Sequence, residues 1–116
     1  MEQIYPDLDH LILEMSDGDA DFQKQLTMAI HQGLVELKEV YGIGSSKKDE
    51  EKIQQIRHKL KPTLSMFELS HIIDELQRGK EIIESDGFEG VRFESHFLRL
   101  EEKLDLAIKR VHSLMA

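Results

Sequence analysis

Apolar residues recur at intervals of three and four through almost the whole chain, and this spacing restricts the fold more than any other feature of the sequence. Residues three or four apart share one face of an α-helix, because each residue advances by about 100°. Only two prolines and seven glycines interrupt the 116 residues. The sequence therefore predicts an all-α fold. The clearest run is Phe93, Phe97, Leu100, Leu104, Ile108, Val111 and Met115.

The same spacing divides the chain into five expected helices, of which the first two lie before residue 42. The first is short, follows Pro6 and Asp7, and carries Leu8, Leu11, Ile12 and Met15. The second begins near Asp19, and its expected inward residues are Phe22, Leu26, Ala29, Ile30, Gly33, Leu37 and Val40. Gly33 would permit close helix packing. Residues 42–48 are expected to form a loop, because glycine and serine favour non-helical backbone.

Two more helices are expected at about residues 49–66 and 68–85, and a turn at residues 86–90 leads to the last. Their inward residues are Ile53, Ile56, Leu60, Leu64 and Phe67, and then Leu69, Ile72, Ile73, Leu76 and Ile83. Four long amphipathic helices joined by short loops bury their apolar faces most simply as an antiparallel four-helix bundle, here with an additional short N-terminal helix. We expect residues 1–116 to form a single domain, because the chain has the length of one.

The composition excludes several classes of function. The chain has no cysteine, which excludes disulfides, thiolate metal sites and cysteine nucleophiles. Its net charge of −8 repels phosphate backbones, so nucleic acid is not expected as a partner. No apolar run approaches the roughly 20 residues that cross a bilayer, and no nucleotide-binding or kinase motif is present. We expect a cytoplasmic monomer without a cofactor and without a membrane partner.

His58 is the clearest candidate for a residue with a chemical role. On an ideal helix with Ile53 at 0°, the apolar residues of the 49–66 segment lie within about 60°, whereas His58 lies at about 140°. The histidine is therefore expected to face solvent. Four further residues fall between about 80° and 180°, on the same exposed side: Gln54, Lys61, Pro62 and Ser65. Met66 lies outside the apolar arc and could join a docking surface.

An exposed imidazole is largely neutral near pH 7, and its free ring nitrogen is a competent nucleophile towards phosphorus. Lys61 follows one turn later and could offset the negative charge of a phosphoryl group on His58. From periodicity alone, an ordinary surface histidine beside an ordinary surface lysine is the more common explanation.

The residues His58-Lys59-Leu60-Lys61, followed by Pro62 and Thr63, resemble the H-x-L-K-G-[ST] signature of the histidine-containing phosphotransfer (HPt) domain family. The order of helices resembles that family across nearly the whole chain. The resemblance implies a four-helix bundle in which His58 accepts a phosphoryl group from a receiver-domain aspartate and passes it on, with Lys61 as the supporting cation. It implies a phosphoryl carrier without kinase activity of its own. The implied partners are a response-regulator receiver domain and/or a hybrid histidine kinase.

The sequence departs from the family pattern at three positions. Pro62 and Glu68 occupy positions where the family usually has glycine, and a proline is expected to kink the helix beside His58. Lys80 lies 22 positions after His58, where many members have glutamine or glutamate, and no role is assigned to it. The partner is expected to dock on the face of the second and third helices. Its expected contacts are Gln54, Lys61, Pro62, Ser65 and Met66.

Two alternative functions remain open. A non-catalytic helical adaptor could display His58 without using it. A metal-dependent bundle enzyme could use Glu68-x-x-His71, the spacing by which a carboxylate and an imidazole share a metal on one helix face, and Asp7-x-x-His10 is the nearest variant. The remaining histidines, His31, His96 and His112, are expected at the surface or at its boundary.

Overall fold

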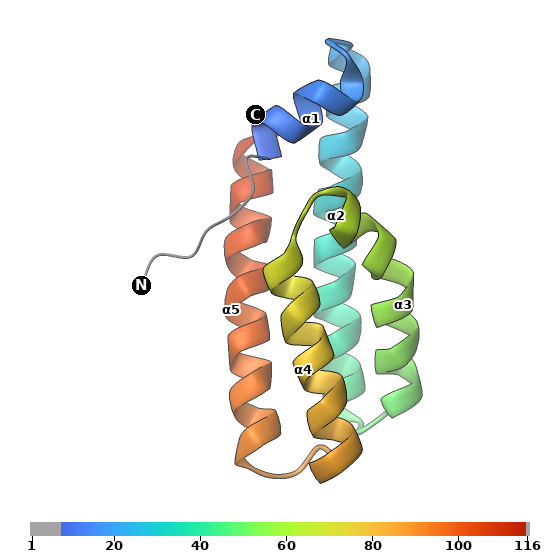
Figure 1. The fold of residues 1–116 in the computed structure, drawn as a ribbon, viewed down its shortest axis with the longest axis vertical. Helices are drawn as coiled ribbons and strands as arrows, with labels where there is room; N and C mark the ends of the chain where they lie inside the picture. Colours follow the sequence, from blue (N-terminus) through green and yellow to red (C-terminus); the bar gives the residue numbers. More distant parts are fainter. Residues whose placement is uncertain (1–7, 116) are drawn as a thin grey trace.

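The computed structural model describes residues 8–115, and all the regular secondary structure in this range is helical (Figure 1). The expected helix start at Pro6 and Asp7 lies outside the described residues. The all-α prediction is confirmed. The five helices are α1 (Leu8–Ser16), α2 (Ala20–Ser46), α3 (Glu50–Met66), α4 (Ser70–Asp86) and α5 (Val91–Ser113).

The four longer helices, α2 to α5, run along the long axis of a molecule that measures 47 × 31 × 20 Å, and successive helices alternate in direction (Figure 1). Helix α2 packs against α3 and α5, and α4 packs against the same two helices. The short α1 lies across the end where α2 begins and α5 ends, and it packs against α2. An ion pair between Asp9 and Arg110, 3.4 Å apart, also joins α1 to α5.

Aspartate residues cap the starts of α2 and α3, which lie close to the expected starts near residues 19 and 49. The Asp19 carboxylate accepts hydrogen bonds from the backbone N–H groups of Asp21 and Phe22, at 3.0 and 3.1 Å. The Asp49 carboxylate accepts one from the Lys52 N–H at 3.1 Å. These side chains satisfy N–H groups that have no partner within the helix.

The expected loop at residues 42–48 is wrong for residues 42–46, because α2 continues to Ser46. The reason is packing between α2 and α3. Gly44 is buried, and a Cβ atom there would lie only 2.8 Å from Cγ1 of Ile53. The glycine therefore allows two helices to approach closely, and tertiary contact outweighs its helix propensity, which is about 1 kcal/mol below that of alanine. Gly33 has the expected similar role, with Cδ1 of Leu60 at 2.9 Å from its Cβ position.

The core agrees best with the sequence in α3, where all the expected inward residues are buried. In α2 the expected buried face differs in part from the observed one. Phe22 and Ala29 were expected to face inward but are exposed, whereas Leu34 and Tyr41 were not expected there and are buried. Because α2 is covered by α3 and α5 from two sides, its buried face is wider and differently centred than one apolar stripe suggests. At the end of α5, Met115 is 41% exposed and also lies outside the core.

Within residues 8–115, none of the helices combines the length and the apolar character needed to cross a membrane.

Candidate functional site

His58 lies on the exposed side of α3, as the helical spacing predicted. The sequence folds this way because Ile56 and Leu60, on either side of the histidine, turn inward and are buried. The residues predicted to contact a partner are all exposed as well: Gln54, Lys61, Pro62, Ser65 and Met66. Met66 is 55% exposed, so its apolar side chain is open to solvent.

A cavity of about 120 Å³ lies beside His58, between α3 and α4. It is lined by Arg57, His58, Lys61 and Leu64 from α3 and by Ile73, Leu76, Gln77 and Lys80 from α4. We call it the His58 cavity. A smaller cavity of about 60 Å³ is lined by other residues of the same two helices, and it shares Arg57 and Lys80 with the first. Gln54 lines this second cavity, whereas Pro62, Ser65 and Met66 line neither.

Sequence reasoning missed three polar residues of the His58 cavity: Arg57, Gln77 and Lys80. A signal for the two on α4 was present, because Ile73, Gln77 and Lys80 are spaced by four and three residues and therefore share a helix face. What the spacing could not show was that this face borders α3 beside His58. The hollow next to the histidine thus lies towards α4, whereas the expected docking face was on the second and third helices.

Lys59, the residue after His58, points towards a different neighbour. Its ammonium lies 2.9 Å from the carboxylate of Glu36 on α2, in an ion pair that is open to solvent. Lys59 therefore joins α3 to α2 and is not among the residues that line the His58 cavity.

Pro62 lies inside α3, which remains one helix as far as Met66. A proline nitrogen carries no hydrogen, so the carbonyl of His58 lacks the intrahelical donor that another residue at position 62 would supply. We expect Pro62→Ala to raise the free energy of unfolding by about 2 kcal/mol, because proline in a helix interior is about 3 kcal/mol less favourable than alanine and part of this is offset by the stiffer unfolded chain.

Urea unfolding followed by circular dichroism measures this change. The ring of Pro62 is exposed, so no packing is lost in the variant. A variant less stable than the wild type would contradict the prediction. Ser65→Ala, at an exposed position one turn further on, is the control and is expected to change stability by less than about 0.5 kcal/mol.

The alternative of a metal site at Glu68-x-x-His71 is not supported by the position of Glu68. Glu68 precedes α4, in a turn where its φ angle is +55°, so it does not share a helix face with His71. No group of three or more histidine and acidic side chains within residues 8–115 could hold a metal ion. Asp7, in the nearest variant of the spacing, lies outside the described residues.

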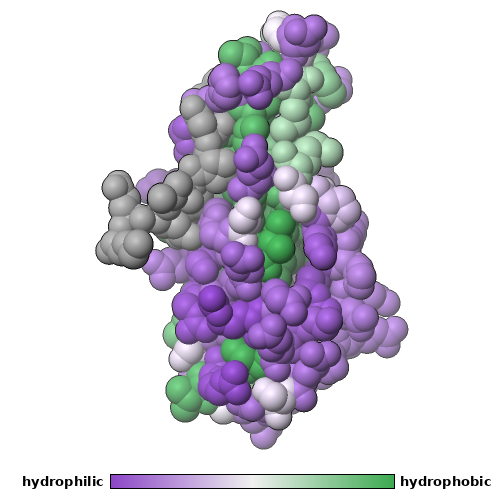
Figure 2. Space-filling view, viewed as in Figure 1, coloured by the Kyte–Doolittle hydropathy of each residue, from purple (hydrophilic) through white to green (hydrophobic). Residues whose placement is uncertain are grey.

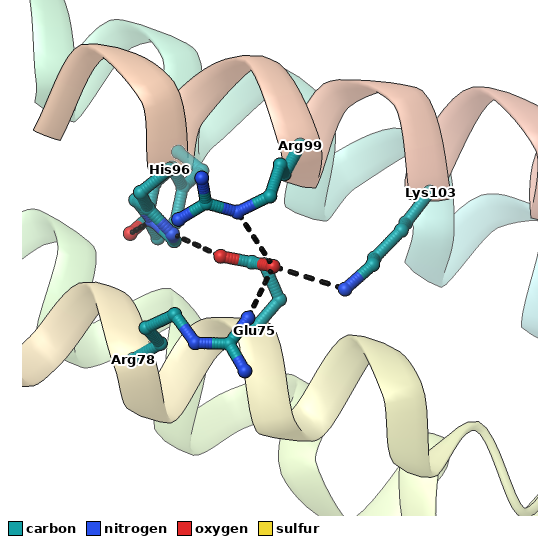
Figure 3. Close-up of polar contacts among 6 residues, drawn as sticks. Glu75, Arg78, His96, Arg99 and Lys103 are labelled. Atoms are coloured by element: carbon teal, nitrogen blue, oxygen red, sulfur yellow. Dashed lines mark hydrogen bonds and ion pairs between the residues drawn. The ribbon is translucent and has the colours of Figure 1, made fainter. Parts of the chain in front are cut away.

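A second polar constellation lies inside the protein, where α4 faces α5 (Figure 3). The fully buried carboxylate of Glu75 is 2.8 Å from Nδ1 of His96 and 2.9 Å from Nζ of Lys103. Arg78 contacts it at 2.9 Å and Arg99 at 3.4 Å. Three cations and one imidazole therefore converge on one carboxylate, and Figure 3 shows the three cationic side chains reaching it from α4 and α5.

His96 links this carboxylate to a third helix, because its Nε2 lies 2.8 Å from the hydroxyl oxygen of Tyr41 on α2. Burial lowers the pKa of His96 below its ordinary value of 6.5, despite the opposing effect of the hydrogen bond that its ring donates to Glu75. We assign the neutral ring a proton on Nδ1, which donates to Glu75, while Nε2 accepts from Tyr41. Burial also raises the pKa of Tyr41, so its hydroxyl keeps the proton that it donates.

The expectation that His96 lies at the surface or its boundary is wrong, because its exposed fraction is 0%. The sequence did contain a signal: His96 follows the inward Phe93 by three residues, as Glu75 follows Ile72. A polar side chain at an inward position of a helix needs a hydrogen-bonding partner, and two such residues on neighbouring helices can satisfy each other. His31 is partly buried and His112 is exposed, as expected.

The surface site and the buried cluster offer different chemistry. His58 presents a solvent-accessible nucleophile beside cations and an amide, whereas the imidazole of His96 is hydrogen-bonded through both ring nitrogens and inaccessible. In comparisons with known proteins, the chain matches no protein-family model, no curated protein and no solved structure.

Proposed function

We propose that this chain is a histidine phosphotransfer protein of a two-component phosphorelay, with His58 as the phosphoacceptor. The observation that carries the proposal is the exposed His58 imidazole, which lines a cavity whose other polar groups are three cations and one amide. The likeness of His58-Lys59-Leu60-Lys61 to the HPt signature supports the same role. The chain acts as a carrier, without kinase activity of its own.

The fold that belongs to this proposal is an antiparallel four-helix bundle of α2 to α5 with α1 as an additional short helix. The pairwise contacts support it, because α2 and α4 each pack against both α3 and α5 and so close a ring of four helices. The alternating directions of these helices also support it (Figure 1). In such a bundle, an outward-facing histidine on α3 is held on a rigid element.

In the proposed reaction a receiver domain presents an aspartyl phosphate to His58. The neutral imidazole nitrogen attacks phosphorus in line, an N–P bond forms, and the P–O bond to the aspartate breaks with the carboxylate as leaving group. Lys61 stabilises the charge on the transferring oxygens. The reverse reaction passes the group to a second receiver.

The partner in this proposal docks over the exposed residues that surround His58. Pro62, Ser65 and Met66 extend the surface beyond the cavity along α3, and Gln54 extends it in the other direction. Met66 supplies an exposed apolar contact that charged residues border. An apolar centre with a charged rim is typical of a small, transient interface. The pyrrolidine ring of Pro62 is compact, so it leaves room for the aspartyl phosphate to reach the imidazole.

The proposal is tested by incubating the protein with phosphorylated receiver domains and measuring phosphate that is labile in acid and stable in base. We expect the label on the wild type and none on His58→Gln, because an amide nitrogen is not a nucleophile. His112→Gln is the matched control, since His112 is also exposed but lies on α5. It should be labelled like the wild type.

Equal labelling of His58→Gln and the wild type would place the phosphate elsewhere and overturn the assignment. If a broad set of receivers leaves the wild type unlabelled, the phosphotransfer proposal fails and a non-catalytic helical adaptor is the better description.

A further inference from the structure

The cations that line the His58 cavity differ from most others in the protein. Eight of the fifteen lysine and arginine side chains form ion pairs with carboxylates inside residues 8–115. Arg57, Lys61 and Lys80 form none in this part of the chain, although the protein carries 23 acidic residues. All three line the same cavity.

Among the described residues, the lining of the cavity contains no carboxylate that could balance these charges. Besides the three cations and His58, it consists of the amide of Gln77 and an apolar floor formed by Leu64, Ile73 and Leu76. Three like charges around one hollow repel one another, and an apolar floor reduces their screening by water. A bound anion removes this repulsion, and the part of the chain that the structure describes contributes no anionic group to the lining.

The size of the cavity limits the anion. A volume of about 120 Å³ is well below the roughly 300–1,000 Å³ of pockets that hold drug-sized ligands. A single tetrahedral anion matches this scale, whereas a nucleotide does not. Arg57 brings a planar guanidinium, which can donate two parallel hydrogen bonds to phosphate oxygens, and Lys80 brings a point charge from the opposite helix.

We propose that the His58 cavity is a binding site for a phosphate dianion, with Arg57 and Lys80 as ligands in addition to Lys61. In the free protein the site takes inorganic phosphate. In the phosphorylated protein the same residues hold the phosphoryl group on His58. This second statement rests on the proposed function, whereas the first does not.

The neighbouring cavity of about 60 Å³ contains carboxylates that could compete with a bound anion for two of the cations. Arg57 and Lys80 also line that cavity, together with the carboxylates of Glu50 and Glu84. Within residues 8–115 neither cation is ion-paired with either carboxylate, so both remain available to an anion on the His58 side. Should the two cations turn to these carboxylates in solution, the site would be lost and phosphate would not bind.

The experiment is a titration of isotopically labelled protein with inorganic phosphate at constant ionic strength, followed by nuclear magnetic resonance. We expect saturable shifts confined to amides of α3 and α4, and no such shifts with chloride. Arg57→Gln and Lys80→Gln are each expected to weaken phosphate binding about tenfold, since each removes a charge-assisted contact. Lys109→Gln, which removes an exposed lysine on α5 that forms no ion pair within residues 8–115, is the matched control and should bind as the wild type does.

Shifts that do not saturate, or equal affinities for Arg57→Gln, Lys80→Gln and the control, would overturn the site. His58→Gln separates this proposal from the proposed function, because it should still bind phosphate while accepting no phosphoryl group. With a phosphorylated receiver, we expect the two cation variants to accept the group about tenfold more slowly than Lys109→Gln. If they bind phosphate weakly but accept the group at the control rate, the role on the phosphorylated histidine is wrong.

Discussion

Gly79→Ala is expected to destabilise the protein by about 2–4 kcal/mol, although alanine is the better helix former by about 1 kcal/mol. Gly79 is buried on α4, directly opposite the Tyr41–His96 hydrogen bond. A Cβ atom at this position would lie 2.2 Å from Nε2 of His96 and 2.7 Å from the hydroxyl oxygen of Tyr41. Neither side chain can move away cheaply, because both are buried and hydrogen-bonded to each other.

Gly42→Ala is the matched control for this change. Gly42 also lies in a long helix, but the nearest atom to its Cβ position is Cζ of Phe97 at 4.0 Å, an ordinary contact. The control should be as stable as the wild type or up to about 1 kcal/mol more stable. Chemical unfolding of the wild type, Gly79→Ala and Gly42→Ala measures these differences in stability. If Gly79→Ala is as stable as Gly42→Ala, the close approach of α4 to His96 is not a constraint in solution.

Glu75→Gln is expected to cost about 3 kcal/mol at neutral pH, because it leaves partly buried cations without their counterion. Glutamine keeps the size of the side chain but removes the charge that Lys103, Arg78 and Arg99 share. Unfolding by urea measures the loss. Asp86→Asn is the control, since it removes a single exposed ion pair to Arg92 and should cost less than about 1 kcal/mol.

The pH dependence of this loss identifies its electrostatic origin. Burial alone would raise the pKa of Glu75, but hydrogen bonds from His96 and Lys103 outweigh it and hold the pKa at about 2, below the ordinary 4.5. A carboxylate with a depressed folded-state pKa stabilises the fold above its unfolded-state pKa, and this stability disappears as the pH falls from about 4.5 towards 2. The shift corresponds to about 3 kcal/mol.

The difference in stability between the wild type and Glu75→Gln should therefore be full at pH 6 and narrow as the pH falls through this range. A difference that stays constant down to pH 3 would mean that Glu75 acts through its hydrogen-bond acceptors rather than through its charge. His96 adds to acid sensitivity in both proteins, because its lowered pKa means that the unfolded chain takes up a proton first as the pH falls below about 6.5.

Helix α4 connects the buried cluster to the surface site. Its inward side carries Glu75 and Gly79, and the adjacent residues Leu76 and Lys80 line the His58 cavity. The hydrogen bonds and close packing on the inward side fix the rotation of α4 about its own axis. This rotation in turn determines that Gln77 and Lys80 face α3 beside His58. The side of the molecule formed by α3, α4 and α5 is otherwise mostly hydrophilic, with smaller apolar areas (Figure 2).

The sequence predicted the local features well where one periodic signal dominates. In α3, the spacing of Ile53, Ile56 and Leu60 gave both the buried face and the exposed position of His58, because side-chain direction along a helix follows directly from residue number. The expected starts of α2 and α3, near residues 19 and 49, each lie one residue before the observed starts, and the structure shows Asp19 and Asp49 as their caps.

The sequence was wrong where long-range contacts override local preference. The glycines at 42 and 44 suggested a loop, but the contact between Gly44 and Ile53 keeps them in α2. His96 looked like a surface residue because an imidazole is polar, and only its pairing with Glu75, 21 positions earlier in the chain, makes its burial favourable.

By itself, then, the sequence determined the helices, the all-α class and the outward direction of His58, all of which depend on intervals of a few residues. Only the tertiary structure decided which helices are neighbours. That choice brings Lys80 to the cavity of His58 and joins Tyr41, Glu75 and His96 in one buried cluster. The physical reason is that burial and charge pairing depend on distances between helices, and these distances are set by the packing of the whole chain.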